Sequence, residues 1–182
     1  MARKMPRNAA RKPYRVGRSR TGLGLFATAP IKNGAFIIAY RGRLLTHAQA
    51  AKLEARGNRY MYEINSRWTV DGSSRRNIAR YANHSCRPNA ESDVVKRNVI
   101  LRAIRNIKPG DEITYNYGRD YFLNVITPRG CKCDKCRAKR AAAQAKTRAK
   151  ARAKGRAKTR AKSRAKSRVK AGAKARAGKR RT

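Results

Sequence analysis

The chain has 182 residues and a formal net charge of +40 at pH 7, because 49 lysines and arginines stand against only nine acidic residues. This length holds one domain of ordinary size with tails. The sequence contains no apolar stretch long enough to span a membrane, and its basic N-terminus lacks the apolar core of a secretory signal. We therefore expect a soluble, intracellular protein.

The positive charge is concentrated toward the C-terminus. Residues 137–182 contain 21 lysines and arginines and no acid, and the first 136 residues contain the other 28 with all nine acids. Apolar runs that could form a core lie between Tyr14 and Tyr121, which is enough chain for one small core. The arm at residues 1–12 has no apolar residues at helical or strand spacing, so we expect it to be disordered.

The body between these segments is predicted to be mostly β, because short apolar runs alternate with Gly, Pro and Asn. The predicted strands are Leu25–Ala27, Ala35–Tyr40, Tyr60–Ile64, Trp68–Val70, Val99–Ile104 and Glu112–Tyr115. One short helix is predicted after Thr46, since Thr46 and Gln49 can form a capping box and Gly57 is a stop signal. The pattern alone leaves a barrel, a sandwich and an irregular arrangement open.

Two glycines, Gly22 and Gly24, mark a place where the backbone turns tightly or approaches a ligand. Taken alone, such a pair is more often an ordinary turn. A third glycine at dinucleotide-binding spacing is missing and no long βαβ pattern follows, which disfavours a Rossmann fold.

The four cysteines have a spacing that suits a metal ion. Cys86 stands alone, and Cys131, Cys133 and Cys136 form a Cys-x-Cys-x-x-Cys cluster much later in the chain. A thiolate zinc site needs four ligands, and the reducing interior of a cell disfavours disulfides. The sequence therefore predicts a zinc site that joins Cys86 to the cluster. The alternative is a buried thiol at Cys86 and a separate surface cluster.

The segment Arg80–Asn89, with the sequence RYANHSCRPN, resembles the signature of the SET-domain protein-lysine methyltransferases. Other segments follow the order of that family along the chain: Gly22–Phe26, Tyr40–Gly42, Asp111–Gly118 and, similar to its post-SET zinc cluster, Cys131–Cys136. The resemblance covers roughly residues 14–136. It implies a SET domain at 13–118 and a post-SET zinc segment at 119–136. The implied fold is an irregular β fold of several small sheets with a threaded C-terminal segment and few helices.

The resemblance also implies roles for single residues. Those expected to bind S-adenosylmethionine are Gly22, Leu23, Gly24, Asn83, His84 and Tyr117. Tyr117 would be the catalytic tyrosine, and Tyr40 and Tyr115 would line the lysine channel. The expected ligands of a structural zinc ion are Cys86, Cys131, Cys133 and Cys136.

These implied roles have plainer alternatives. Asn83 and His84 could be a hydrogen-bonded turn pair, and Tyr115 and Tyr117 could be alternate residues of one strand. A tyrosine at position 115, where the family has Phe or Tyr, leaves less room for a methylated amine. Tyr115 therefore implies mono- or dimethylation.

The tail from Ala145 consists of eight tetrapeptides of the form Ala-Lys-x-Arg, with departures at Val169 and Gly172. Lysines four residues apart repel one another across a helical turn, so we expect residues 137–182 to be disordered in water and helical on a polyanion. The tail resembles those of linker histones and bacterial histone-like proteins, which implies DNA binding. A solvated tail or a localisation signal is the alternative.

The sequence thus predicts S-adenosylmethionine-dependent methyl transfer to lysines of a histone or histone-like protein, with the tail bound to DNA in a nucleus or nucleoid. The rival hypothesis is a histone-like, DNA-compacting protein whose SET body binds peptides without turnover. A ribosomal protein, a host's chromatin and the chain's own tail, at Lys162 and Lys166, are further possible targets. Methylation of the tail would be automethylation in trans.

Overall fold

The structure is a computed structural model that describes residues 12–178. The arm predicted at 1–12 lies, apart from Lys12, outside the described residues. The chain divides into two compact units, Met1–Cys136 and Arg137–Thr182.

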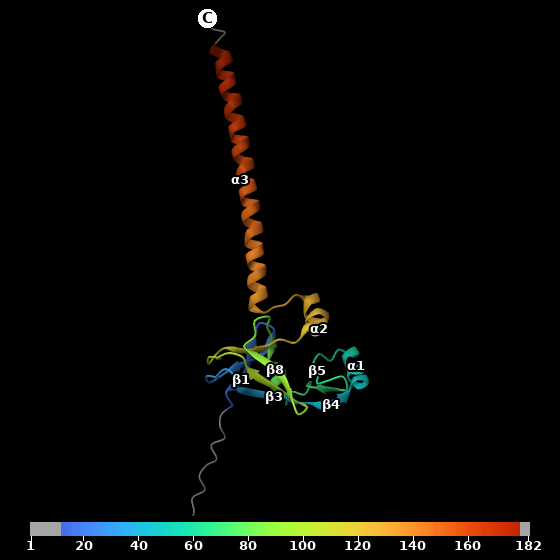
Figure 1. Cartoon of the computed structure of the whole chain (residues 1–182). Helices are drawn as coiled ribbons and strands as arrows, with labels where there is room; N and C mark the ends of the chain where they lie inside the picture. Colours follow the sequence, from blue (N-terminus) through green and yellow to red (C-terminus); the bar gives the residue numbers. More distant parts are fainter. Residues whose placement is uncertain (1–11, 179–182) are drawn as a thin grey trace, which may run out of the picture. The chain divides into compact units, whose positions relative to one another are not determined.

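The first unit is built from three small sheets, and Figure 1 labels at least one strand of each. The first contains, in spatial order, β1 (Tyr14–Ser19), β2 (Gly22–Ala27), β10 (Glu112–Tyr115) and β7 (Asn83–His84). The second contains β3 (Phe36–Tyr40), β9 (Asn98–Ala103) and β8 (Ala90–Val95). The third contains β4 (Arg43–Thr46), β6 (Trp68–Asp71) and β5 (Met61–Glu63). The predicted fold of several small sheets with few helices is confirmed.

The core lies where apolar side chains of these strands meet. Strand β9 alternates buried and partly exposed residues, with Val99 and Leu101 each 1% exposed, as expected for a strand with one buried face. Leu25 of β2 and Ile113 of β10 are fully buried in the same cluster. The first two sheets therefore share one hydrophobic core, although each is too small to be stable alone.

Strand β10 joins two distant parts of the sequence. It pairs antiparallel with β2 and parallel with β7, where Thr114 is opposite Asn83 and Tyr115 is opposite His84. The buried Asn89 side chain reinforces this arrangement, because its amide donates to the Glu112 carbonyl at 2.9 Å and accepts from the Thr114 N–H at 2.8 Å. The Asn-His pair and the tyrosine strand are thereby fixed side by side.

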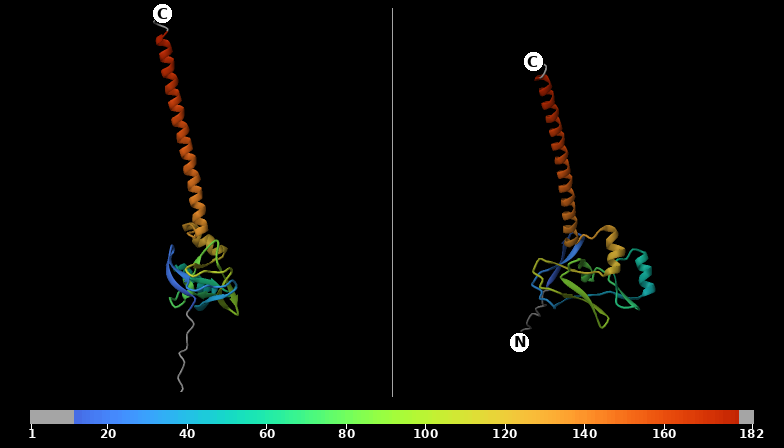
Figure 2. Two further views of the ribbon diagram at one scale, coloured as in Figure 1. Left: turned by 90° about the vertical axis from the view of Figure 1, so that its left-hand side faces the viewer. Right: turned by 45° about the horizontal axis from the view of Figure 1, so that its top comes forward.

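The single helix predicted in the body is confirmed as α1 (His47–Ala55). The Thr46 hydroxyl accepts from the Gln49 N–H at 3.4 Å, and the Gln49 side chain accepts from the Thr46 N–H at 3.0 Å, which completes the capping box. The chain leaves α1 through Gly57, which has a φ of 89°. Figure 2 shows α1 on the same side of the body as α2 (Arg119–Tyr121).

Short helical turns in the first unit were missing from the sequence prediction. They are η1 (Ile78–Tyr81), α2, the π-helical η2 (Phe122–Ile126) and η3 (Thr127–Arg129). Segments this short show less than two helical periods, so hydrophobic periodicity cannot identify them. The turns from α2 to η3 contribute to the site described below.

The described part of the basic tail lies in helix α3, which runs from Asp134 to Gly178. Alanine, lysine and arginine have high helix propensity, and Asp134 places an acid in the first turn, where it interacts favourably with the helix dipole. The disorder of residues 137–182 in water stays a prediction. Within residues 12–178, helices lack the combination of length and hydropathy that crossing a membrane requires.

Candidate active site

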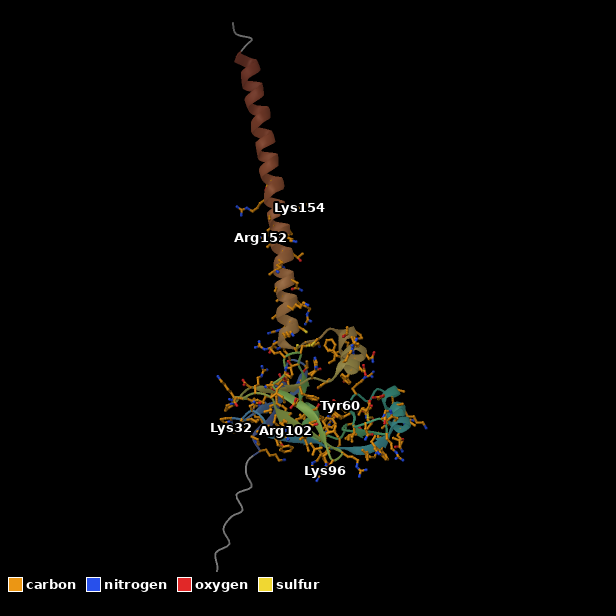
Figure 3. The ribbon with its side chains drawn as sticks, in the orientation of Figure 1. Lys32, Tyr60, Lys96, Arg102, Arg152 and Lys154 are labelled. Carbon is orange, nitrogen blue, oxygen red and sulfur yellow. The ribbon has the colours of Figure 1, made fainter. Side chains whose placement is uncertain are left out.

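A cavity of about 1310 Å³ lies in the first unit between α1, β5 and the segment that follows β10. Its most common side chain is tyrosine, and seven of the eight tyrosines of the chain line it: Tyr40, Tyr60, Tyr62, Tyr81, Tyr115, Tyr117 and Tyr121. Tyr60 is labelled in Figure 3. Ordinary ligand pockets measure roughly 300–1,000 Å³, so this cavity has room for a small molecule and a side chain of a second molecule together.

Three of these tyrosines, Tyr40, Tyr115 and Tyr117, form one wall of the cavity, in which Tyr117 is only partly buried. The Tyr115 and Tyr117 rings lie 4.8 Å apart between centroids, and Tyr40 and Tyr115 are only 7% and 8% exposed. The Tyr117 hydroxyl donates to the Ala82 carbonyl at 2.8 Å, and the Tyr40 hydroxyl donates to the Tyr60 carbonyl at 3.0 Å.

Burial keeps the phenols of this wall protonated. It raises the pKa of Tyr40, of Tyr115 and of Tyr117 well above the ordinary value for tyrosine, because a phenolate would lose its hydration there. The wall is therefore uncharged at neutral pH. It offers aromatic faces and hydroxyl oxygens, which suit a cationic or amine ligand.

The glycine-bearing strand β2 meets Asn83 at this cavity. The Asn83 amide donates to the Leu23 carbonyl at 3.0 Å and to a Glu112 carboxylate oxygen at 2.7 Å. Gly24 has no room for a side chain, because a Cβ there would run into the Glu112 carboxylate and the Ser19 side chain. Leu23 and Asn83 line the cavity. The backbone of β2 thus lies close to Asn83, as a site for an extended ligand requires.

His84 lies behind the cavity and contacts both Tyr117 and the cysteines. Its Nδ1 accepts from the Tyr117 backbone N–H at 3.3 Å, and its Nε2 is 3.3 Å from the Cys86 sulfur. The ring packs edge-on against Tyr117, with a centroid distance of 5.5 Å, and at a tilt of 45° against Phe122, with a centroid distance of 5.4 Å. Burial lowers the pKa of His84, so the imidazole is neutral at pH 7.

The four cysteines, which are far apart in sequence, come together as free thiols. All four sulfurs lie within 4.8 Å of one another. The Cys86 sulfur is 3.9 Å from that of Cys131 and 3.6 Å from that of Cys136. Four sulfurs at about 2.3 Å from a tetrahedral zinc ion lie about 3.8 Å from one another. This donor set therefore fits Zn²⁺, and the alternative of two separate groups of cysteines is wrong.

One thiol of this group ionises easily. Burial disfavours the Cys133 thiolate, but hydrogen bonds from the backbone at Cys86 and Cys136 outweigh this effect and lower the pKa of Cys133 to about 7. Burial and the neighbouring thiols raise the pKa of Cys86. A cation that is held by all four sulfurs would remove this difference, because it favours every thiolate.

The structure brings most of the predicted site residues to one place. Those that line the cavity are Leu23, Tyr40, Asn83, Tyr115 and Tyr117. Gly22, Gly24 and His84 do not line it but lie next to residues that do. The predicted residues thus form one cavity and one adjoining sulfur cluster.

Two residues of the site were missed by the sequence analysis. Glu112 orients the Asn83 amide, and only the pairing of β10 beside β2 brings it there. Arg80 lines the cavity, and its guanidinium lies 3.8 Å from the centre of the Tyr60 ring. The guanidinium donates to the Ser73 carbonyl, and the buried Nε has no hydrogen-bond partner among the described residues. Arg80 begins the RYANHSCRPN segment, but its spacing does not indicate a stacked position.

The first unit combines small sheets, a cavity lined by tyrosines beside an Asn-His pair, and an adjoining four-cysteine cluster. Together these features define the class of protein. Residues 22–118 match the model of the SET domain, which is more than half of the chain. The chain belongs to the SET-domain family.

Curated relatives support the same family. A histone-lysine N-methyltransferase named trithorax, from Drosophila virilis, is 37% identical over 125 residues, which are 64% of this chain and 3% of the relative. A histone-lysine N-methyltransferase described as H3 lysine-4 specific, from Schizosaccharomyces pombe, is 34% identical over 140 residues, 71% of this chain and 15% of the relative. The chain therefore spans only a small part of the length of these relatives.

Solved structures show the same likeness. The polycomb repressive complex 2 of Chaetomium thermophilum matches with a TM-score of 0.55 and 30% identity over 60% of this chain and 16% of that chain. A structure of ctPRC2 in an autoinhibited conformation bound to S-adenosylmethionine matches with a TM-score of 0.55 and 30% identity over 59% of this chain and 15% of that chain.

Proposed function

We propose that this chain is an S-adenosylmethionine-dependent methyltransferase that modifies the ε-amine of protein lysines. The observation that carries the proposal is the uncharged wall of Tyr40, Tyr115 and Tyr117, the first two buried and the third partly buried, in the same cavity as Asn83 and Leu23. One end of such a cavity suits a cofactor against β2, and the other suits an amine among tyrosines. The names of the relatives, which are histone-lysine N-methyltransferases, support this choice of reaction.

The residues of the chain would contribute mainly alignment. S-adenosylmethionine supplies an electrophilic methyl group on a sulfonium. Asn83, with its amide held by Leu23 and Glu112, and the open backbone of β2 would bind this cofactor. In-line displacement needs the attacking nitrogen and the methyl carbon on one axis, and fixed positioning of this kind is worth about 7–11 kcal/mol at best.

The tyrosine wall would prepare the lysine. An ammonium group has no lone pair, so the amine must lose its proton before it attacks. Desolvation lowers the pKa of a lysine, and the aromatic wall excludes water around it. The Tyr117 hydroxyl, held at the Ala82 carbonyl, keeps an oxygen lone pair free to accept from the amine.

Charged residues of both signs line the cavity. Three of the nine acids of the chain are among them, from α1, β5 and α2: Glu54, Glu63 and Asp120. Four arginines also line it: Arg59, Arg75, Arg80 and Arg119. These charges alone do not select a basic substrate. The names of the relatives, which are histone-lysine N-methyltransferases, favour histones and histone-like proteins as the substrate class.

The direct test is incubation with labelled S-adenosylmethionine and a panel of basic proteins, followed by intact-mass measurement and peptide mapping. The panel contains histones, a histone-like nucleoid protein, ribosomal proteins and the chain itself. Addition of 14 Da increments to any of them supports the proposal. Absence of label from every protein would favour the rival, a DNA-compacting protein whose SET body binds peptides without turnover. Label on Lys162 or Lys166 would identify automethylation.

Tyr115 is proposed to limit the product to mono- or dimethyllysine. Its ring fills the wall next to Tyr117, and it is only 8% exposed. The Tyr115→Phe variant removes one hydroxyl and so makes room beside the amine. We expect it to shift products toward trimethyllysine, as measured by mass spectrometry of a modified peptide at matched turnover. An unchanged product distribution would count against a channel position for Tyr115.

The basic tail is proposed to bind DNA and so to keep the enzyme on chromatin or a nucleoid. Helix α3 carries exposed lysines and arginines along residues 137–156, and Figure 3 shows the side chain of Lys154 projecting away from the helix axis. Contacts to phosphates release counterions. The logarithm of the DNA affinity should therefore fall linearly with the logarithm of the salt concentration, with a slope of about −0.9 for each phosphate neutralised.

The tail prediction is tested with two chains, the full protein and a variant that ends after Cys136. We expect the full chain to bind duplexes of unrelated sequence equally well and with a steep salt slope. The shortened variant should lose most of that slope and keep methylation of a free peptide, because the first unit is compact by itself. A slope that is unchanged by the truncation would place DNA binding outside the tail.

A further inference from the structure

The side chain of His84 connects the cysteine cluster to the backbone of Tyr117. The Tyr117 backbone N–H lies 3.3 Å from His84 Nδ1. A backbone N–H can only donate, so Nδ1 must carry a lone pair. In a neutral imidazole the proton is then on Nε2, and Nε2 lies 3.3 Å from the Cys86 sulfur. The hydrogen bonds of the ring thus fix its tautomer.

The hydrogen bond between His84 Nε2 and the Cys86 sulfur has a direction that suits a metal-bound sulfur. With its proton on Nε2, His84 donates to Cys86, and a thiolate accepts such a bond better than a thiol because it is charged. The sulfur set fits Zn²⁺, as described above, and a zinc-bound Cys86 would be a thiolate. The aromatic contacts with Tyr117 and Phe122 limit rotation of the ring. Its two nitrogens therefore remain aimed at two different parts of the site.

We propose that the His84 imidazole is a positioning residue, which couples the loaded cysteine cluster to the orientation of Tyr117. Nε2–H donates to the Cys86 sulfur and supports metal binding. Nδ1 accepts a hydrogen bond from the Tyr117 N–H and so fixes the backbone from which the Tyr117 side chain projects. The hydroxyl of that side chain would contact the substrate amine. This role of the side chain rests on the proposed function and is separate from any contact of the His84 backbone with the cofactor.

Nuclear magnetic resonance of the imidazole nitrogens tests the tautomer directly. The chain has only two histidines, His47 and His84, so the His47→Gln variant leaves one imidazole to observe. In the zinc-loaded protein we expect a protonated Nε2 and an unprotonated Nδ1 at pH 7. A proton on Nδ1 would overturn the proposal. This measurement needs no substitution at His84 and no turnover, so it stays decisive if a variant fails to fold or if methyl transfer is not found.

Two substitutions at His84 separate its hydrogen bond to the Cys86 sulfur from its hydrogen bond to the Tyr117 N–H. In His84→Gln the side-chain amide reaches the place of Nε2 and can still donate to sulfur, but the acceptor for Tyr117 is lost. In His84→Asn the shorter side chain places an oxygen near Nδ1 and loses the donor to sulfur. Partners of metal ligands typically contribute about 10–100-fold to metal affinity or activity. We expect zinc affinity to fall by that factor in His84→Asn and kcat to fall by that factor in His84→Gln.

The controls assign each effect to its bond. His84→Phe keeps a ring of similar size and should lose both properties, whereas Phe122→Leu removes an aromatic contact of the ring and should keep zinc affinity. Zinc affinity is measured by competition with a chelator, and kcat and KM for the cofactor are measured on the zinc-loaded protein. KM for the cofactor should change less than kcat. Equal losses of both properties in the Gln and Asn variants would contradict separate roles for the two nitrogens.

Discussion

Replacement of Tyr117 by phenylalanine is expected to lower turnover by about 100-fold or more, because a catalytic group that is no longer positioned loses rate on this scale. The ring remains, so the volume of the cavity and its contact with Tyr115 are retained. What is lost is one hydroxyl that the Ala82 carbonyl holds at 2.8 Å. Cofactor affinity, measured by calorimetry, should stay nearly unchanged.

A second readout of the Tyr117→Phe variant is stability. The Ala82 carbonyl loses its side-chain partner, and a lost buried hydrogen bond costs about 1 kcal/mol of the free energy of unfolding. Tyr14 is the only tyrosine that does not line the cavity, so Tyr14→Phe is the matched control and should keep full turnover. Turnover within a few-fold of the wild type in Tyr117→Phe would exclude it as the catalytic tyrosine.

The second large effect is expected from Cys86→Ser, which should release zinc and abolish most activity together. Cys86, just after β7, is the one expected ligand from outside the Cys131–Cys136 cluster, and its sulfur lies within 4.8 Å of those of Cys131, Cys133 and Cys136. A serine oxygen is a poor substitute for a thiolate, so the later segment would lose its anchor. The segment from α2 to η3, which ends just before Cys131, contributes Tyr121 to the cavity.

Elemental analysis of the purified wild type comes first in this experiment, and fewer than about half an equivalent of zinc would remove the premise of a four-sulfur site. Cys131→Ser should behave like Cys86→Ser, since each removes one ligand. The neighbouring Ser85→Ala variant changes a side chain beside Cys86 without removing a sulfur, and it should keep the metal. Full activity in a zinc-free Cys86→Ser protein would show that the cluster does not support the cavity.

Much of the fold could be predicted because the information is local. The capping box of Thr46 and Gln49 identified α1, and alternating or continuous apolar residues identified the main strands, such as β9 and β10. These signals depend on residues only a few positions apart. The strand β8 and the helical turns after β10 were missed because their sequences are polar or too short to show a period.

The arrangement of the site could be predicted only through the family resemblance. Composition and spacing left barrel, sandwich and irregular folds open, and they did not place Thr114 opposite Asn83. The contact of Glu112 with Asn83 depends on the pairing of β10 with β2 and β7, and the contact of Arg80 with Tyr60 joins η1 to the segment before β5. Residue patterns alone could not reveal either contact. In the tail, helix propensity and the repulsion between lysines oppose each other over the same residues, so the sequence pattern alone does not fix its state in water.

The pairing of β10 with β7 has a consequence for how the molecule folds. Thr114 is 31 residues from its partner Asn83, and the Cys86 sulfur meets ligands 45 and 50 residues away. Closing such long loops is opposed by chain entropy, so contacts of this kind form after local hairpins such as β1–β2 and β8–β9. During synthesis the tyrosine strand and the three-cysteine segment also leave the ribosome after these hairpins. The hairpins can therefore assemble early as a scaffold, and the cavity is complete only when the final segment of the body has docked.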